Sequence, residues 1–464
     1  MTVPPGSGGR ATACKGAGRM AQDQILFDVT RLVRRSGSAT PTGVDRVELT
    51  YGRHMLERYP NEVQFIARWR SRYWQLSTPA FAQFVANRWE RWSFGAHRIR
   101  TKDVERIARF IGVPAEQFNG SGRNSVSPPV PPARPSAPLL QLGMDALLGA
   151  RGLLSRMISI SARRQQAIYV NVSHEGLHQP ATLQRLVARR KLAPIYLVHD
   201  LIPIDHPEYV RPGYAARHVA RIEAISTTAA ATIVNSQQTK RDLMKHVQRH
   251  HGGMDDVFVA PLGVDRRFAP QKVNDLESEP YFLIIGTIEP RKNHLFMLQI
   301  WRALVQKLGR AAPKLVIVGR RGWENENVID MIERCEQISD HVIELGRVPD
   351  AVLHRLLIGT RAVLFPSFAE GYGLPLVEGL SCSVPVICSD LPVFHELGSG
   401  IPEYLDPLDG PGWMDMIMNY AQPNSPRRQA QMARLARFKA PTWDRHFNIF
   451  DNVVEDVRRK YSIC

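Results

Sequence analysis

The sequence predicts an α/β protein built from two Rossmann-like domains. Its 464 residues are enough for two domains of ordinary size, each with its own hydrophobic core. In both halves of the chain a short apolar run is followed by a glycine-bearing turn and then by a helical pattern, as in 25–60 and 281–301. This order is typical of parallel sheets whose strands are joined by helices.

The composition is that of a globular protein. Hydrophobic residues make up 44% of the chain and charged residues 22%. There is no apolar run of about 18 residues, the length that a membrane-spanning helix needs. Residues 1–23 lack the apolar core of a secretory signal, and we expect them to form a disordered tail. The five cysteines contain no C-x-x-C pair, which favours reduced thiols and a cytoplasmic location.

The net charge of +16 indicates an anionic partner. Residues 68–110 carry ten Arg or Lys against three acidic residues, and 119–138 are rich in Pro and Ser. We interpret about 75–165 as a basic, Pro-rich insertion in the first domain. It is either a surface that docks on an anionic membrane or holds a lipid-linked acceptor, or a solvated basic face. We expect no nucleic-acid partner, because no module for one is recognisable.

The stretch from Leu364 to Leu380 carries the strongest functional pattern. A buried strand is expected to end at Phe365, and Gly371 and Gly373 then bracket Tyr372 before a helix begins near Leu374. Such a turn exposes backbone N–H groups and the positive end of the helix dipole, which together attract a phosphate.

Two carboxylates frame this turn. Glu370 precedes it and Glu378 lies about one turn into the helix, with seven residues between them. Beside a phosphate, a carboxylate is better placed to accept hydrogen bonds from sugar hydroxyls. The pattern therefore predicts a site for a ligand with both a phosphate and a sugar. The alternative is an ordinary strand–turn–helix with solvated glutamates.

A second candidate site begins the second domain, in the sequence YFLIIGTIEPRKN. Gly286 allows the backbone to approach a ligand, and Arg291 and Lys292 stand side by side before a helix. Two cations at the end of a parallel strand suit a diphosphate. Solvated cations are the alternative, although they would oppose the helix dipole.

The first domain offers matching loops. The strand in ILFDV is followed by a polar loop that carries Gly43 and then by a helix. Another apolar run, APIYLV, leads directly into His199 and Asp200. Because ligands bind at the carboxyl ends of strands in open α/β sheets, we expect this pair to face a ligand.

The spacing of Glu370 and Glu378 around GYGLPLVEG resembles the E-x7-E motif of retaining GT-B glycosyltransferases, family 4, which include mannosyltransferases. The resemblance covers 24–60 and 167–460 and implies two Rossmann-like domains that face each other across a cleft. It implies an acceptor-side domain over 24–262, a nucleotide-sugar-binding domain over 263–442, and a last helix in 443–464 that crosses back.

The resemblance also implies roles for single residues. In the catalytic set, Arg291 and Lys292 stabilise the departing diphosphate, Glu370 binds the transferred sugar, and His199 and Asp200 approach it from the other domain. The nucleobase is contacted through the backbone of Arg347 and Val348, and the ribose by Glu378. The full substrate-binding set is Gly43, Gly286, Thr287, Arg347, Val348, Gly371, Tyr372, Gly373, Leu374 and Glu378.

The expected activity is transfer of a hexose from a nucleotide diphosphate sugar to a hydroxyl of a glycan or lipid-linked acceptor, in cell-surface polysaccharide synthesis. Mannose from GDP-mannose is the expected donor, and no further cofactor is expected. The sequence has no D-x-D pair, so we expect Arg291 and Lys292 to hold the diphosphate without a metal ion. An epimerase of nucleotide sugars and a non-catalytic protein that binds anionic surfaces remain alternatives.

Overall fold

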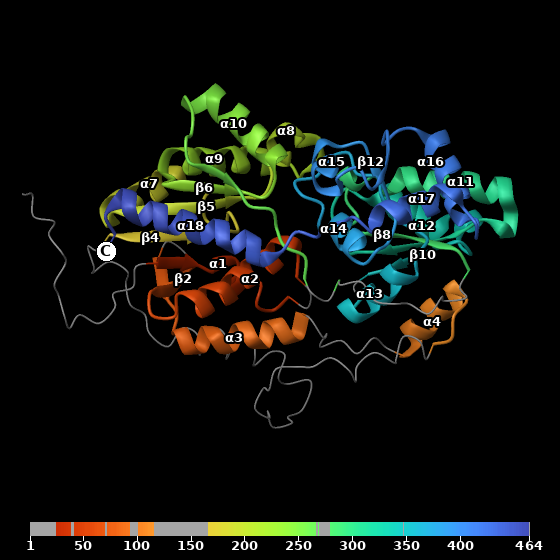
Figure 1. Ribbon diagram of the computed structural model, residues 1–464, viewed down its shortest axis with the longest axis horizontal. Coiled ribbons are helices and arrows are strands. Elements are labelled where there is room, and N and C mark those ends of the chain that lie inside the picture. The colour runs from red at the N-terminus through yellow and green to blue at the C-terminus, as the bar shows by residue number, and fades with distance from the viewer. Residues whose placement is uncertain are drawn as a thin grey trace, which may run out of the picture.

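The computed structural model describes residues 25–38, 41–69, 72–92, 101–115, 166–265, 268, 279–346 and 348–463. These form two α/β domains that lie side by side, each around its own sheet (Figure 1). The expected tail, residues 1–23, and most of the expected insertion lie outside the described residues. The prediction of two Rossmann-like domains is confirmed.

The first sheet has seven strands in the order β3-β2-β1-β4-β5-β6-β7. Apart from the β2–β3 pair, its described pairings are parallel. The residues of the central strands β1, β4 and β5 are buried because helices cover both faces of the sheet. Its strands are β1 (Ile25–Asp28), β2 (Val63–Trp69), β3 (Arg72–Gln75), β4 (Ala167–Asn171), β5 (Leu192–Val198), β6 (Ala231–Val234) and β7 (Val257–Val259).

The second sheet has six parallel strands in the order β10-β9-β8-β11-β12-β13. The carboxyl ends of its central strands β8 and β11 bear the two loops that the sequence singles out. Its strands are β8 (Tyr281–Ile285), β9 (Lys314–Val318), β10 (Val342–Leu345), β11 (Val363–Phe365), β12 (Val386–Ser389) and β13 (Glu403–Leu405).

The helices follow the strands in the expected alternation. In the chain before the second sheet they are α1 (Thr30–Arg34), α2 (Gly43–Arg58), α3 (Thr78–Glu90), α4 (Thr101–Ile111), α7 (Pro180–Arg190), α8 (Ile202–Asp205), α9 (Tyr214–Thr228) and α10 (Gln237–His251). After β8 come α11 (His294–Leu308), α12 (Glu326–Arg334), α13 (Asp350–Gly359), α14 (Leu374–Ser381), α15 (Pro392–Gly398), α16 (Gly410–Ala421), α17 (Pro426–Leu435) and α18 (Trp443–Tyr461).

Residues 64–74, which the sequence suggests as one strand, form two antiparallel strands instead. Ile66 of β2 pairs with Gln75 of β3, and Trp69 pairs with Arg72. The sequence gives no signal of this chain reversal, because residues 70 and 71 are Arg and Ser and not the glycine or proline that marks most tight turns.

The described parts of the segment 75–165 belong to both domains. Helix α3 is part of the first core, where Phe81 stacks on Phe65 with ring centroids 4.0 Å apart. Helix α4 lies beside the second domain (Figure 1). There the backbone N–H of Glu279 donates to the carbonyl of Ile111 at 3.2 Å, and Lys314 lies over the ring of Phe110. A single insertion in the first domain therefore does not describe this segment.

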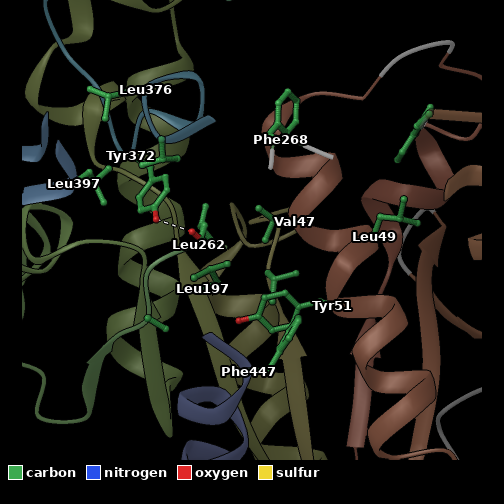
Figure 2. Close-up of a cluster of buried hydrophobic side chains, with 14 of the residues drawn as sticks. Val47, Leu49, Tyr51, Leu197, Leu262, Phe268, Tyr372, Leu376, Leu397 and Phe447 are labelled. Carbon is green, nitrogen blue, oxygen red and sulfur yellow. Dashed lines mark hydrogen bonds between the residues drawn. The ribbon is translucent and has the colours of Figure 1, made fainter. Parts of the chain in front are cut away.

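The last segment of the chain leaves the second domain. After α17 it returns to the first domain, where α18 packs on β4, β5 and β6 (Figure 1). His446 fixes this return: its Nδ1 donates to the carbonyl of Ala260 at 3.0 Å, so its Nε2 accepts from the hydroxyl of Tyr51 at 2.6 Å. Figure 2 shows Tyr51 and Phe447 beneath the junction of the two domains, where one apolar cluster continues from the first domain into the second.

Candidate active site

The loop between β11 and α14 folds as its glycines require. Gly373 has φ +99° and precedes the first residue of α14, and a Cβ there would lie 2.8 Å from the ring of Phe394. Only glycine fits both the backbone angle and the space. The loop is tied to the neighbouring loop after β8, because the N–H of Phe368 donates to the carbonyl of Arg291 at 2.8 Å.

Arg291, Lys292 and Glu370 form one buried ionic cluster where these loops meet. Arg291 donates from Nη1 to Oε2 of Glu370 at 2.8 Å, and Lys292 donates to Oε1 of the same carboxylate. Ser367 donates its hydroxyl to Oε1 at 2.8 Å. A second carboxylate, Glu289, holds Nε of Arg291 at 2.6 Å. The alternative of solvated cations is wrong, since both cations are paired and largely buried.

The cluster keeps Glu370 ionised. Burial alone would raise its pKa, but the charges of Arg291 and Lys292 outweigh burial and lower the pKa to about 2. An ionised carboxylate has about four acceptor positions, and the bonds from Lys292, Ser367 and Arg291 use three of them. One position on Oε2 is left for a ligand hydroxyl.

His199 and Asp200 follow β5 in the first domain. The Nε2 of His199 lies 2.7 Å from the carbonyl of Val172, so this nitrogen carries the proton and donates it. Burial lowers the pKa of His199, so the ring is neutral near pH 7 and its Nδ1 is an acceptor. The carbonyl of His199 accepts from Asn235 at 2.9 Å, which fixes the backbone at this point.

The two halves of the site touch. A Cβ on Gly371 would lie 2.6 Å from the Cβ of Asp200 and 2.7 Å from the carbonyl oxygen of His199. The carbonyl of Gly371 accepts from the hydroxyl of Thr239 at 3.2 Å and from that of Ser236 at 3.4 Å. The glycine turn of the second domain is therefore docked on the first turn of α10 in the first domain.

Glu396 makes a second bridge at the same helix end. Its two carboxylate oxygens accept from the backbone N–H groups of Gln237 and Gln238, at 2.7 and 3.1 Å. The side chain of one domain thus caps a helix of the other. On the opposite side of the cleft Arg46 of α2 donates twice to Asp350 of α13, at 2.8 and 3.2 Å.

The structure places the other predicted residues at several points of the cleft. Gly43 and Leu374 face each other across it, since a Cβ on Gly43 would lie 3.4 Å from Cδ1 of Leu374. Glu378 lines a small cavity of about 40 Å³ with Leu374, Arg46 and Trp443. A cavity of this size holds a few water molecules but not a nucleotide.

Three predicted residues lie close to the ionic cluster or to the expected nucleobase position. Gly286 packs beside the side chain of Lys292, and Thr287 follows it in the same loop. Val348 stands between β10 and α13. Arg347, expected next to it, lies outside the described residues.

The side chain of Tyr372 packs at the junction of the two domains. Figure 2 shows its hydroxyl pointing to the carbonyl of Leu262, to which it donates at 2.7 Å. Only the backbone of Tyr372 is left for a ligand. This bond ties the glycine turn to the segment where the chain crosses into the second domain.

The sequence interpretation overlooked Glu289, Thr239 and the bridging roles of Glu396 and Arg46. A signal existed only for Glu289, which stands two residues before Arg291 in EPRKN. In the described part of the chain no His, Cys, Asp and Glu side chains group in threes to hold a metal ion. Within the same ranges no helix is long and apolar enough to cross a membrane.

Comparison with known proteins finds similarity in sequence and in fold. Residues 265–398 match the family "Glycosyl transferases group 1". O-antigen chain mannosyltransferase B of Escherichia coli is 36% identical over 255 residues, which cover 53% of this chain and 66% of that protein. O-antigen chain mannosyltransferase RfbU of Salmonella typhimurium is 33% identical over 230 residues, 48% of this chain and 60% of that protein.

Two further comparisons bear on the extent of the similarity. Serotype-specific mannosyltransferase WbdA of Escherichia coli is 30% identical over 220 residues, and the chain spans only 26% of its length. The crystal structure of Anabaena Alr3699/HepE in complex with UDP and glucose has a TM-score of 0.52 at 13% identity, and covers 95% of this chain and 100% of that one. That likeness shows the fold.

The fold and the cleft define a GT-B glycosyltransferase architecture. Residues 265–398 match the glycosyl transferases group 1 family, and the chain is similar to the mannosyltransferases named above.

Proposed function

We propose that the protein is a retaining glycosyltransferase that moves a hexose from a nucleotide diphosphate sugar to a hydroxyl of a glycan or lipid-linked acceptor. Mannose from GDP-mannose is the proposed donor, because the relatives compared above are named as mannosyltransferases. Assembly of a cell-surface polysaccharide is the proposed process, since two of these relatives are named for O-antigen chains.

The observation that carries this proposal is the ionic cluster in the cleft. Arg291 and Lys292 are held at one point by Glu370 and Glu289. Asp200 and His199 of the first domain lie against Gly371, the residue after Glu370. Cations that are already ordered stabilise charge on a leaving diphosphate without reorganisation. We propose that they do this without a metal ion.

Each remaining group has a role in this scheme. The free acceptor position of Glu370 takes a hydroxyl of the transferred sugar, and Glu378 takes the ribose hydroxyls. Neutral His199 accepts a hydrogen bond from the sugar through Nδ1. No protein nucleophile is proposed: the leaving phosphate oxygen takes the proton of the acceptor hydroxyl as the new bond forms on the same face of the sugar.

The domains must separate before a donor can enter. The cavity at Glu378 is too small for a nucleoside, and the contacts at Gly371 close the other side of the cleft. Opening and closing would therefore accompany each turnover. The bridges at Glu396 and Arg46 are the contacts that opening would break.

A thermal-shift screen tests the donor class. Purified protein is heated with GDP-, UDP-, dTDP- and ADP-sugars, with Glu378→Ala and Lys292→Ala as matched controls. A ligand that binds only the folded state raises the melting temperature. We expect GDP-mannose to stabilise the wild type and neither variant. Stabilisation by none of the donors, or breakdown of the donor without any acceptor, would contradict the proposal.

We further propose that the protein works in the cytoplasm, peripherally on the inner face of the membrane, through the basic and aromatic part of 75–165. Deleting that whole range is no test, because Phe81 and Phe84 of α3 belong to the core. Flotation with phosphatidylglycerol vesicles is better compared with Arg98→Gln/Arg100→Gln. Unchanged flotation would rule out these charges as the docking surface.

A further inference from the structure

A second concave site lies in the first domain, away from the ionic cluster. It is a cavity of about 260 Å³ between the β2–β3 hairpin and α7. Four arginines line it: Arg68 from β2, and Arg185, Arg189 and Arg190 from α7. No acidic side chain is among the residues that line it.

The positions of the arginines in α7 lower the stability of that helix. Arg185 and Arg189 are four residues apart and therefore neighbours on one face, where like charges destabilise a helix. Helix α7 has no acidic residue of its own. Near the carboxyl end Arg189 and Arg190 gain from the helix dipole, but Arg185 stands too far from that end to share this benefit. The arrangement suits an anion that lies between the three guanidinium groups.

Arg68 is the fixed member of the group. Its guanidinium donates to the carbonyl of Gly176 at 3.0 Å and to the side chain of Gln179 at 2.6 Å. Its backbone N–H donates to the hydroxyl of Thr30 at 2.8 Å. An ordered guanidinium loses little freedom when it binds an anion, and its planar fork matches two phosphate oxygens.

One loop links the cavity to the cleft. Loop 172–179 joins β4 to α7 and contains His178, whose pKa is lowered by burial and then by the charges of Arg217 and Arg221. The same loop provides the carbonyl of Val172 that holds His199. A ligand in the cavity would therefore lie along the first domain beside the acceptor side of the cleft.

Apolar and aromatic side chains line the cavity as well. Leu183, Leu186 and Tyr73 line it together with the arginines. A phosphate that is attached to an apolar or aliphatic group meets both kinds of surface at once. We propose that this arginine pocket binds the phosphate or diphosphate of an anionic amphiphile, as a site separate from that of the donor. The proposal does not depend on the proposed function, because no residue of the ionic cluster takes part.

The test compares two double variants with equal loss of charge. Arg189→Gln/Arg190→Gln changes the pocket, and Arg241→Gln/Arg249→Gln changes exposed arginines of α10. A thermal melt of each variant without ligand shows whether it folds. If the pocket pair does not fold, Arg185→Gln replaces it, since that side chain is exposed.

Two probes separate the sources of the phosphate. The first is flotation of the full chain with phosphatidylcholine vesicles, with and without phosphatidylglycerol. If the ligand is a lipid headgroup, the pocket pair should bind the anionic vesicles about 30-fold more weakly than the wild type, and the α10 pair much less so. Equal losses in both pairs would mean non-specific attraction and would rule out a lipid headgroup as the source of the phosphate.

The second probe is calorimetric titration with inorganic pyrophosphate. If the ligand is a diphosphate outside a membrane, the wild type should bind two equivalents, one of them at Arg291 and Lys292, and the pocket pair only one. A single equivalent that survives in the pocket pair but is lost in Lys292→Ala, together with no selective loss of vesicle binding, would overturn the proposal while leaving the donor site intact. If the wild type instead binds one equivalent that the pocket pair loses and Lys292→Ala keeps, the result counts against the proposed function and not against this proposal.

Discussion

Gly371 of the second domain lies directly against Asp200 of the first, with no room for a Cβ between them. A Cβ at residue 371 would meet the side chain of Asp200 and the carbonyl oxygen of His199 at once. Closure of the cleft therefore requires that residue 371 is a glycine, which has no side chain.

Gly371→Ala should leave the fold intact and prevent full closure. The added methyl group would meet Asp200 at 2.6 Å only when the domains are together. We expect a loss of kcat/KM of about 100-fold, because displacement by about 1 Å is enough for that effect, and little change in the melting temperature of the free protein. Gly410→Ala is the control, since its Cβ would make an ordinary contact at 3.6 Å. Full activity in Gly371→Ala would show that the closed contact is not used in turnover.

Glu370→Gln and Lys292→Met should separate binding from turnover. Without the carboxylate, Arg291 and Lys292 keep their positive charge and bind GDP as tightly as before or more tightly. The sugar loses its charged acceptor, so kcat should fall by about 10²–10³. Lys292→Met should instead weaken GDP binding by about 10- to 100-fold, as expected for a charged hydrogen bond.

For Glu370→Gln and Lys292→Met, calorimetry measures the affinity for GDP and steady-state kinetics measure kcat. A Glu370→Gln variant that loses GDP affinity as strongly as Lys292→Met would mean that the carboxylate mainly orders the cations. Glu370 would then be a positioning residue and not a contact of the sugar.

Glu396→Ala should shift the protein toward an open cleft. The change removes the cap that the second domain places on α10, and loss of a helix cap costs about 1 kcal/mol. We expect a larger radius of gyration in small-angle scattering and a higher KM for the donor. Asp409→Ala removes a cap within the second domain, at Gly412 of α16, and should cost similar stability without either effect.

His446→Gln should reduce the loss of folding stability that occurs as the pH falls. Burial lowers the pKa of His446 from 6.5 to about 4, so the folded protein keeps the ring neutral while the unfolded chain takes up a proton below pH 6.5. The stability that this adds is complete above pH 6.5 and is lost as the pH falls toward 4. At pH 5 the loss is about 2 kcal/mol.

Urea unfolding at pH 7 and pH 5 measures this difference. His174, His199, His218 and His294 have pKa values shifted in the same direction, so the wild type should lose more stability than His446 alone explains. The variant should lose about 2 kcal/mol less between the two pH values. An equal loss in both proteins would mean that the His446 ring is protonated in the fold.

Local patterns in the sequence were enough for the fold class and for the strand, turn and helix around Gly371. Glycine and proline determine that turn by their own backbone preferences, so neighbours matter little. The hairpin at 64–74 was missed because its turn has no such residue. The segment 75–165 was misjudged because whether a helix such as α4 packs on one domain or the other depends on distant partners, here Glu279 and Lys314.

The site residues stay predictions, but the structure adds what a sequence cannot provide. That Glu370 holds both cations depends on two loops 78 residues apart, and nothing in either loop specifies the pairing. Glu396 and Arg46 act across the cleft, where partners are set by how two domains meet. Tyr372 differs from these residues. It stands at the centre of the motif that the sequence singles out, but its side chain points into the junction between the domains.

The return of the chain to the first domain through α18 has a consequence for the order in which the domains mature during synthesis. The six strands of the second sheet, β8 to β13, come from one continuous stretch and can pair as soon as it leaves the ribosome. The first domain cannot, because α18 covers β4, β5 and β6 and is translated almost last. Contacts between segments that are so far apart form slowly. The half that emerges first is therefore finished last, and until then its sheet has an uncovered face that chaperones can bind.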